Sequence, residues 1–427
     1  MINFIDRRRN LLLALILAAG IGLRVAAALF IGSARLPYEL EFEEIARNLV
    51  QHGTYSYSFY GLSPNQLSSF IPPVYPLFLA FADLISHTNG DWLVKAVQIF
   101  ASELTILSLY ALTVELGGSK RQGLLVATFW AIYPPAIAYA SDLSTVTLEV
   151  FFFIPGIWLL MRAVKRTSAW LVIPAGVLLA LAGLTRSTWL VVLPLAIIWL
   201  IWYLGRKWKT WLKMALFFCL ASGITLLPWM VHNYQAQGKW LLTSTNGGLN
   251  FWIGNNPKAT GEYIFPTAID EKLVLSVANL PEINRDQFFY SQGLAFMRKS
   301  PGAFVSLLGR KLLYSIFFRP NIGSTYQAAQ ISLYSLSIIA FIGAWLILLP
   351  FAVIGLFHLE GHWREHSLLI LAFLGNVATS TIYFSGTRFR TPVDGFAMIW
   401  AAVGLAFIVH RWKQRKSSED KRFIQSD

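Results

Sequence analysis

Long apolar runs, separated by short polar connections, dominate the pattern along this chain. Ten of them are long enough for an α-helix to cross the hydrocarbon core of a bilayer, which takes about 20 residues. They lie near residues 10–32, 93–116, 123–140, 145–161, 169–184, 188–204, 214–230, 331–357, 367–384 and 393–410. The pattern predicts an all-α polytopic membrane protein with about ten transmembrane helices.

Basic residues indicate how these helices are oriented. Lysines and arginines gather in short connections, at Lys120 and Arg121, Lys165 and Arg166, Arg206 to Lys209, and in the tail from Arg411. Because cytoplasmic connections carry an excess of Lys and Arg, we expect both termini in the cytoplasm. Residues 33–92 and 231–330 are then extracytoplasmic.

Two apolar segments are not predicted to form transmembrane helices. Residues 71–85 are short, begin beside two prolines and contain Asp83, so we expect an interfacial or re-entrant helix there. Residues 301–319 carry Arg310 and Lys311 and are also expected to form an interfacial helix.

The chain divides into four expected parts. A core membrane module covers residues 1–230 and includes the acidic first outer loop, 33–92. An extracytoplasmic loop region with an interfacial helix covers 231–330. C-terminal transmembrane helices cover 331–410, and a basic cytoplasmic tail covers 411–427.

The composition agrees with a membrane protein and excludes several kinds of partner and site. The sequence is 56% hydrophobic and 13% charged, with a mean hydropathy of +0.54, which no soluble core requires. Its net charge of +13 lies largely in the connections, so we attribute it to membrane orientation and expect no nucleic-acid partner. The single cysteine, Cys219, lies within a span and excludes a disulfide framework or a thiolate metal site.

An acidic segment follows the first span. Residues 38–53 read YELEFEEIARNLVQHG and hold four of the chain's 22 acidic residues. Their apolar and polar positions separate at helical spacing, which predicts a short amphipathic helix on the membrane surface, ended by Gly53. Interfacial helices usually carry basic residues to meet anionic lipids, so an acid-rich one indicates carboxylates that face a protein cavity. We interpret this segment as part of an active site.

Other polar groups are expected on the same outer face. Asp142 follows the third span and is equally well interpreted as a helix cap. Arg186 stands at a membrane boundary, where an arginine can also extend to lipid head groups. The motif RFRTP places Arg388 and Arg390 just before the last span. The stretch 228–263 is rich in Gly, Asn, Trp and Tyr, which suits either sugar recognition or an interfacial aromatic belt.

This inventory fits glycosyl transfer from a lipid-linked donor. A sugar on a polyprenyl phosphate presents its phosphate at the level of the lipid head groups and its sugar in water. Transfer needs a carboxylate to accept the proton of the acceptor hydroxyl, and cations to stabilise the departing phosphate. Arginine suits the phosphate because its planar, permanently charged guanidinium binds two oxygens at once. The outer face therefore predicts a membrane glycosyltransferase.

Several stretches carry a resemblance to a known family: YELEFEEIARNLVQHGTYS, IPPVYPLFLAF, SDLSTVTLE, PWMVHNYQAQGKW with STNGGLNFWIGNNPKATG, and RFRTP. Together they resemble the bacterial branch of the protein O-mannosyltransferase superfamily, the glycosyltransferase family 39-like proteins with the GT-C fold. Relatives include the aminoarabinose transferase of lipid A and the Rgt-type galacturonosyltransferases. The resemblance implies an inverting transfer from a polyprenyl-phosphate sugar, with a catalytic acid in the first extracytoplasmic loop.

The resemblance also implies which acid is the base. Many relatives carry a pair of acids at the positions of Tyr38 and Glu39, so the first acid of that pair is missing here. Another branch has a single Glu that corresponds to Glu41. We therefore predict Glu41 as the base, with Glu39 as the second choice. Asp142 resembles the family's second acid, either a metal ligand or an orienting group.

The predicted site residues form three groups. Catalytic carboxylates are expected at Glu41, Glu39 and Asp142. The donor phosphate is expected to bind Arg388, Arg390, Arg186 and Lys311, and the sugar or the acceptor to bind Asn246, Trp252, Asn255 and Asn256. The sequence identifies no definite cofactor and leaves a divalent cation such as Mg²⁺ or Mn²⁺ open, for which Glu41 and Asp142 are the expected ligands.

We therefore expect an enzyme of the bacterial cytoplasmic membrane with an extracytoplasmic active site. Its partners would be a polyprenyl-phosphate sugar, an acceptor on a glycolipid, polysaccharide or protein, and the bilayer. Two alternatives stay open: an O-antigen ligase or polymerase that uses a diphosphate-linked glycan, and a lipid-linked sugar flippase or transporter. Charges at the edges of the spans, rather than at their centres, argue against a transporter.

Overall fold

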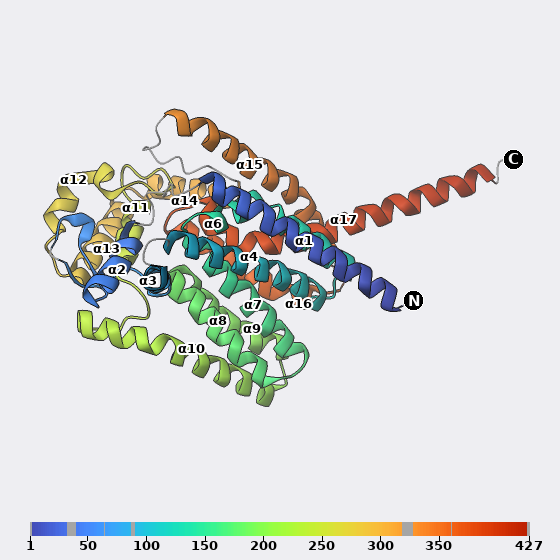
Figure 1. Ribbon diagram of the computed structural model, residues 1–427, viewed down its shortest axis with the longest axis horizontal. Coiled ribbons are helices and arrows are strands. Elements are labelled where there is room, and N and C mark those ends of the chain that lie inside the picture. Colours follow the sequence, from blue (N-terminus) through green and yellow to red (C-terminus); the bar gives the residue numbers. More distant parts are fainter. Residues whose placement is uncertain are drawn as a thin grey trace.

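The computed structural model describes residues 2–31, 40–63, 65–86, 90–317, 328–359 and 361–424. A bundle of long helices makes up most of this part of the chain, and both termini lie at one end of the bundle (Figure 1). The all-α polytopic fold predicted from the apolar runs is confirmed.

The ten predicted runs all fall on helices. These are α1 (Ile2–Ile31), α4 (Gly90–Glu115), α5 (Lys120–Ala131) with α6 (Pro134–Ser141), α7 (Thr145–Lys165), α8 (Val172–Thr185), α9 (Val192–Leu204), α10 (Trp208–Gln237), α15 (Ala328–Phe357), α16 (Trp363–Ile382) and α17 (Thr387–Ile424). Among the described residues, seven helices can cross a membrane by length and composition, and the pair α5 and α6 makes an eighth if it counts as one span. Two short 3-10 segments, η3 (Ala169–Leu171) and η4 (Ser187–Val191), lead into α8 and α9.

The break between α5 and α6 explains an arginine in the first apolar run. The two helices meet at an angle of 53°, and Pro134 at the start of α6 lacks a backbone donor. Arg24 of α1 is fully buried and donates to the carbonyl oxygens of Trp130 (3.3 Å) and Ala131 (3.0 Å), at the end of α5. Its charge is paired with Glu103 at 3.6 Å. Arg24 therefore satisfies backbone groups that the break leaves open inside the bundle.

Several of the predicted cytoplasmic connections lie beside one another. Lys165 at the end of α7 donates to the carbonyl of Glu115 at the end of α4, and Arg162 lies 3.8 Å from the Glu115 carboxylate. Arg364 at the start of α16 donates to the carbonyl of Tyr203 at the end of α9 (2.7 Å). These contacts link the ends of neighbouring helices, as the alternating path of the chain requires.

The remaining elements lie between the membrane helices in sequence. They are α2 (Leu40–His52), β1 (Ser56–Tyr57), η2 (Phe59–Gly61), β2 (Gln66–Leu67), α3 (Val74–Ser86), α11 (Gly247–Gly254), α12 (Pro266–Val277), α13 (Glu282–Lys299) and α14 (Pro301–Ile316). Of these, α2 and α11 to α13 gather at the end of the bundle opposite the termini (Figure 1). With 13 residues, α3 is shorter than a membrane crossing needs.

A small antiparallel ribbon in the first loop was not expected from the sequence. Ser56 pairs with Leu67 and Tyr57 with Gln66. Glu44 of α2 accepts a hydrogen bond from the backbone N–H of Ser58 (2.8 Å), directly after β1. The acidic helix and the ribbon are therefore one folded unit rather than an isolated surface helix.

Candidate active site

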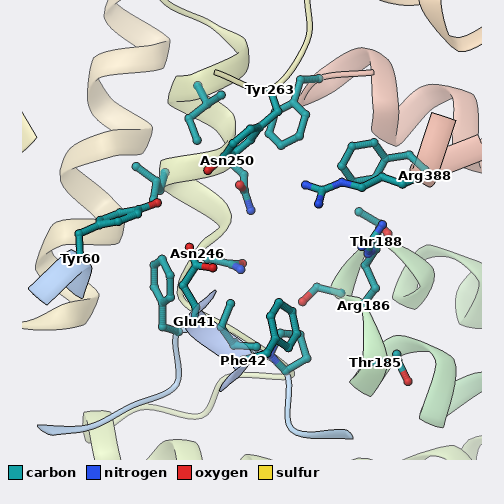
Figure 2. A pocket seen from close by; sticks show the side chains of 18 residues that line it. Glu41, Phe42, Tyr60, Thr185, Arg186, Thr188, Asn246, Asn250, Tyr263 and Arg388 are labelled. Carbon is teal, nitrogen blue, oxygen red and sulfur yellow. The ribbon is translucent and has the colours of Figure 1, made fainter. Parts of the chain in front are cut away.

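A cavity of about 150 Å³ lies where the first loop, α11 and the starts of η4 and α17 meet. Four predicted site residues line it: Glu41, Arg186, Arg388 and Asn246. Figure 2 shows Glu41 on one side of the cavity, with Arg186 and Arg388 on the opposite side. Tertiary structure thus brings together a carboxylate and two guanidinium groups that are far apart in the sequence.

Helix α2 holds Glu41 against the body of the protein. Ile45 and Ala46 on the next turn are buried, and the helix ends as predicted, since Gly53 follows His52 with a φ of +67°. Burial raises the pKa of the Glu41 carboxyl, and the nearby Glu44 raises it further, whereas Arg388 lowers it. Glu41 therefore sits in a low-dielectric site that favours a proton acceptor, with a cation facing it.

Arg186 is held in place by the start of α7. Its Nε lies 3.3 Å from Glu149 Oε2, and its Nη2 donates to Thr145 Oγ1 at 2.7 Å. Glu149 is fully buried and also accepts from the indole N–H of Trp189 (2.9 Å). The guanidinium is therefore fixed in orientation before any substrate arrives, which is the preorganisation that binding of a developing charge requires.

Arg388 lies in the first turn of α17 and shares an aromatic neighbour, Phe389, with Arg186. The guanidinium carbons of Arg186 and Arg388 are 5.0 and 4.9 Å from the centre of the Phe389 ring. Arg388 also lies 5.8 Å from the centre of the Tyr263 ring. Cation–π contact with Phe389 brings both arginines to one wall of the cavity.

Asn246 reaches the cavity because α11 packs very closely against its neighbours. A Cβ on Gly248 would lie 1.9 Å from the carbonyl oxygen of Asp286, and one on Gly254 would lie 1.6 Å from that of Tyr383. Neither position has room for a side chain, which explains the glycines of the NGG and GNN motifs. Asn246 itself precedes the helix, and its Oδ1 accepts from Ser244 Oγ at 2.9 Å.

Two predicted phosphate ligands do not line this cavity. Arg390 is buried, forms an ion pair with Asp394 at 2.8 Å and lies 3.7 Å above the ring of Trp345. Lys311 is fully buried and donates to Asn255 Oδ1 at 2.9 Å. Burial lowers the pKa of Lys311 to about 7. Both cations hold helices together where they stand, so we leave them out of the proposed phosphate site.

The three remaining residues of the predicted sugar loop are also interior. Trp252 packs its ring 5.1 Å from that of Phe289. Asn255 bridges the carbonyls of Phe251 (2.8 Å) and Ile382 (2.9 Å), and Asn256 caps the end of α11 at Trp252. These side chains hold α11 in position through contacts within the protein. Of the four predicted sugar-loop residues, Asn246 is the one that lines the cavity.

Asp142 lies between α6 and α7, buried and outside the lining of the cavity. Its Oδ1 accepts from the backbone N–H of Leu143 at 2.8 Å, whereas the cap of α7 is Ser144. Burial raises the pKa of Asp142 to about 6, Lys95 lowers it and Glu43 raises it. Asp142 therefore does not share the cavity with Glu41. The other predicted acid, Glu39, lies outside the described residues.

The described side chains do not assemble a metal site. Among them, no group of three or more His, Cys, Asp or Glu residues is placed to hold an ion. Glu41 and Asp142, the predicted pair of ligands, do not share the cavity.

Some lining residues were missed by the sequence reasoning. Tyr60 lines the cavity and has a φ of +51°, a left-handed conformation that is rare for a bulky residue and that clusters at functional sites. Tyr263 and Asn250 join it on the lining; both belong to the stretch 228–263, but no local pattern distinguished them from its other residues. Glu149, which does not line the cavity but pairs with Arg186, was also missed although an acid within an apolar run is a functional candidate by default.

Known proteins support the fold. Residues 71–232 match the family model described as dolichyl-phosphate-mannose-protein mannosyltransferase. The sequence matches no curated protein. The oligosaccharyltransferase AglB of Archaeoglobus fulgidus, solved with an inhibitory peptide and a dolichol-phosphate, aligns at 13% identity with a TM-score of 0.57, over 98% of this chain and 52% of AglB. A second structure from that organism, with Zn and sulfate, aligns at 13% identity and a TM-score of 0.58, over 95% and 50%.

The chain spans about half the length of these oligosaccharyltransferases. ArnT of Cupriavidus metallidurans, solved with undecaprenyl phosphate, aligns at 14% identity with a TM-score of 0.45, over 92% of this chain and 76% of ArnT. The matched family model and the shared fold agree with the motifs in the sequence. The chain has the GT-C fold, and its residues 71–232 are similar to the dolichyl-phosphate-mannose-protein mannosyltransferases.

Proposed function

We propose that this protein is a membrane glycosyltransferase that moves a sugar from a polyprenyl phosphate to an acceptor hydroxyl. The observation that carries the proposal is the placement of Glu41 opposite Arg186 and Arg388 in one cavity. The matched family is named for a lipid-phosphate sugar donor, and the AglB structure contains a dolichol-phosphate. Both support a lipid-linked donor.

Each charged group has a role in this reaction. Arg186 and Arg388 bind the donor phosphate, whose negative charge grows as the bond between the sugar carbon and the phosphate oxygen breaks and its electron pair leaves with the phosphate. The acceptor oxygen forms the new bond to that carbon, and Glu41 takes the acceptor's proton. Attack from the face opposite the phosphate gives inversion.

The cavity's position suits a lipid-linked substrate. It is lined by α2, α11 and the start of α17, near the end of the bundle opposite the termini. With the termini in the cytoplasm, as the basic connections predict, that end is extracytoplasmic. We place the reaction there, at the outer surface of the bacterial cytoplasmic membrane, where an isoprenoid tail stays in lipid.

Replacement of Glu41 tests the assignment of the base. Glu41→Gln keeps the size of the side chain but cannot take a proton, so turnover should fall by about 10²- to 10⁴-fold while donor affinity stays nearly unchanged. Glu271→Gln, at an exposed position of α12, is the matched control and should leave both unchanged. Equal losses of turnover and donor affinity in Glu41→Gln would contradict its role as base.

Native mass spectrometry of the gently purified protein identifies the donor class. A co-purifying polyprenyl monophosphate, with or without one sugar, supports the transferase. A polyprenyl diphosphate glycan would favour a ligase or polymerase, and no isoprenoid lipid would favour a transporter. The head group of the bound lipid would also name the sugar.

A further inference from the structure

A second cavity, of about 320 Å³, lies against the first. The two share Ser187, Thr188, Asn246, Asn250, Phe384 and Phe389 as a common wall. Beyond this wall, the second cavity is lined by α13 and α16, through residues such as Tyr290 and Thr379. The second cavity is therefore the immediate neighbour of the phosphate site proposed at Arg186 and Arg388.

The lining of the second cavity differs in charge from that of the first. The first contains Glu41, Arg186 and Arg388, whereas none of the described residues that line the second carries a charge at neutral pH. Its polar groups are hydroxyls and amides, among them Ser244, Asn376, Thr379 and Tyr290. Such groups both donate and accept hydrogen bonds, as sugar hydroxyls do.

Specific packing presents these neutral groups. The hydroxyls of Tyr290 and Tyr383 lie 3.3 Å apart. A Cβ on Gly247 would lie 2.4 Å from the Tyr290 hydroxyl, so glycine is needed there for the tyrosine to reach this position. Asn376 donates to the carbonyl oxygen of Phe389 at 2.8 Å, which ties α16 to the shared wall.

The acid on α13 that precedes Tyr290 is bonded to backbone and is not part of the lining. Asp286 lies one turn before Tyr290 but does not line the cavity, and its Oδ1 accepts the backbone N–H of Gly248 at 2.5 Å. A charged sugar would lose hydration in the second cavity without an oppositely charged partner among the described lining residues, which is costly. An uncharged sugar exchanges its water for hydroxyl and amide partners at little cost.

We infer that the second cavity holds an uncharged sugar unit, either the transferred sugar of the donor or a sugar of the acceptor. The inference rests on the proposed function and narrows its substrate class to neutral carbohydrates at this position. Uronic acids and amino sugars are then poor occupants. The volume, near the lower end of the roughly 300–1,000 Å³ of small-molecule sites, suits a small saccharide.

Lipid binding to the full-length protein tests the inference. The probes are undecaprenyl phosphate alone and undecaprenyl phosphate carrying a neutral hexose, a hexuronic acid or an aminopentose, compared by native mass spectrometry. If the cavity takes the donor sugar, the neutral hexose should raise lipid affinity about tenfold over the bare phosphate, and the charged sugars should not.

Tyr290→Phe removes one hydroxyl and keeps the ring. Loss of one hydrogen bond should weaken binding of the sugar by about 2- to 10-fold and leave undecaprenyl phosphate binding unchanged. Tyr234→Phe, at an exposed position on α10, is the matched control and should change neither. A loss in donor affinity assigns the cavity to the donor sugar, whereas a raised KM for the acceptor with unchanged donor affinity assigns it to the acceptor.

The outcomes that overturn the inference are distinct from those that overturn the function. Two outcomes would overturn the neutral-sugar site alone. One is a Tyr290→Phe effect on donor affinity together with equal or tighter binding of a charged donor sugar, and the other is no effect of Tyr290→Phe on either donor affinity or acceptor KM. Failure of the wild-type protein to bind undecaprenyl phosphate, with or without a sugar, would overturn the proposed function and the inference with it.

Discussion

Arg186 and Glu149 form an ion pair at 3.3 Å, with the carboxylate fully buried behind the cavity wall. The pair joins the end of α8 to the first turns of α7, and Trp189 donates to the same carboxylate oxygen. A buried carboxylate of this kind costs desolvation, so it contributes little net stability. The Glu149 carboxylate instead fixes the orientation of the Arg186 guanidinium.

We expect Glu149→Gln to lower donor affinity through Arg186. The amide removes the charge that holds the guanidinium, and donor dissociation constants should rise about tenfold. Arg186→Gln should weaken binding at least as much, and the double variant should add little to it, because Glu149 acts through Arg186. Isothermal titration with the donor lipid in detergent measures all three. Additive losses would mean that the two residues act independently.

Arg388 should set the pH range of activity. Its positive charge lowers the pKa of Glu41, which burial raises, and Glu41 acts as base only when ionised. Activity is therefore lost as pH falls through the pKa of Glu41. Arg388→Gln removes the lowering contribution, so the acidic limb of the kcat/KM profile should move to higher pH. Arg388→Lys keeps the charge and should leave the acidic limb close to that of the wild type. If the limb does not move in Arg388→Gln, the charge of Arg388 does not affect the pKa of the catalytic base.

Glu282 fastens the two loops that border the cavity. Its carboxylate accepts from the Ser69 backbone N–H and Ser68 Oγ, each at 2.8 Å, and from Thr245 Oγ1 at 2.5 Å. Glu282→Gln should speed hydrogen exchange in residues 66–70 and 243–246 and destabilise the protein by about 2 kcal/mol. Exposed Glu271→Gln is the control, and exchange unchanged from the wild type would show that the loops are held by other contacts.

Gly254 should tolerate no side chain. A Cβ there would lie 1.6 Å from the Tyr383 carbonyl oxygen, so Gly254→Ala must push α11 away from α16, at a cost of about 1–3 kcal/mol. Gly223→Ala on α10 is the matched control, since no atom lies within 4 Å of its Cβ position. Thermal unfolding in detergent should show a lower midpoint for Gly254→Ala alone. A midpoint equal to that of the control would mean that α11 is loosely packed.

Arg388 and Arg390 show what the sequence alone could not predict. Arg388 and Arg390 stand two residues apart in one motif and received one predicted role, yet one lines the cavity and the other pairs with Asp394. Positions two apart on a helix face different directions. Which of the two directions meets a cavity depends on the neighbouring helices, and no local pattern carries that information.

The sequence by itself determined the helical membrane architecture, the acidic helix and its end at Gly53, because these follow from local hydrophobicity and backbone preference. It also indicated the superfamily, through motifs that the matched family and the fold support. Only the tertiary structure decided that Glu41 faces Arg186 and Arg388, that Asp142 lies outside their cavity, and that a second cavity adjoins it whose described lining residues carry no charge. These contacts join residues from different helices, and their distances depend on how the helices pack rather than on any neighbour in the chain.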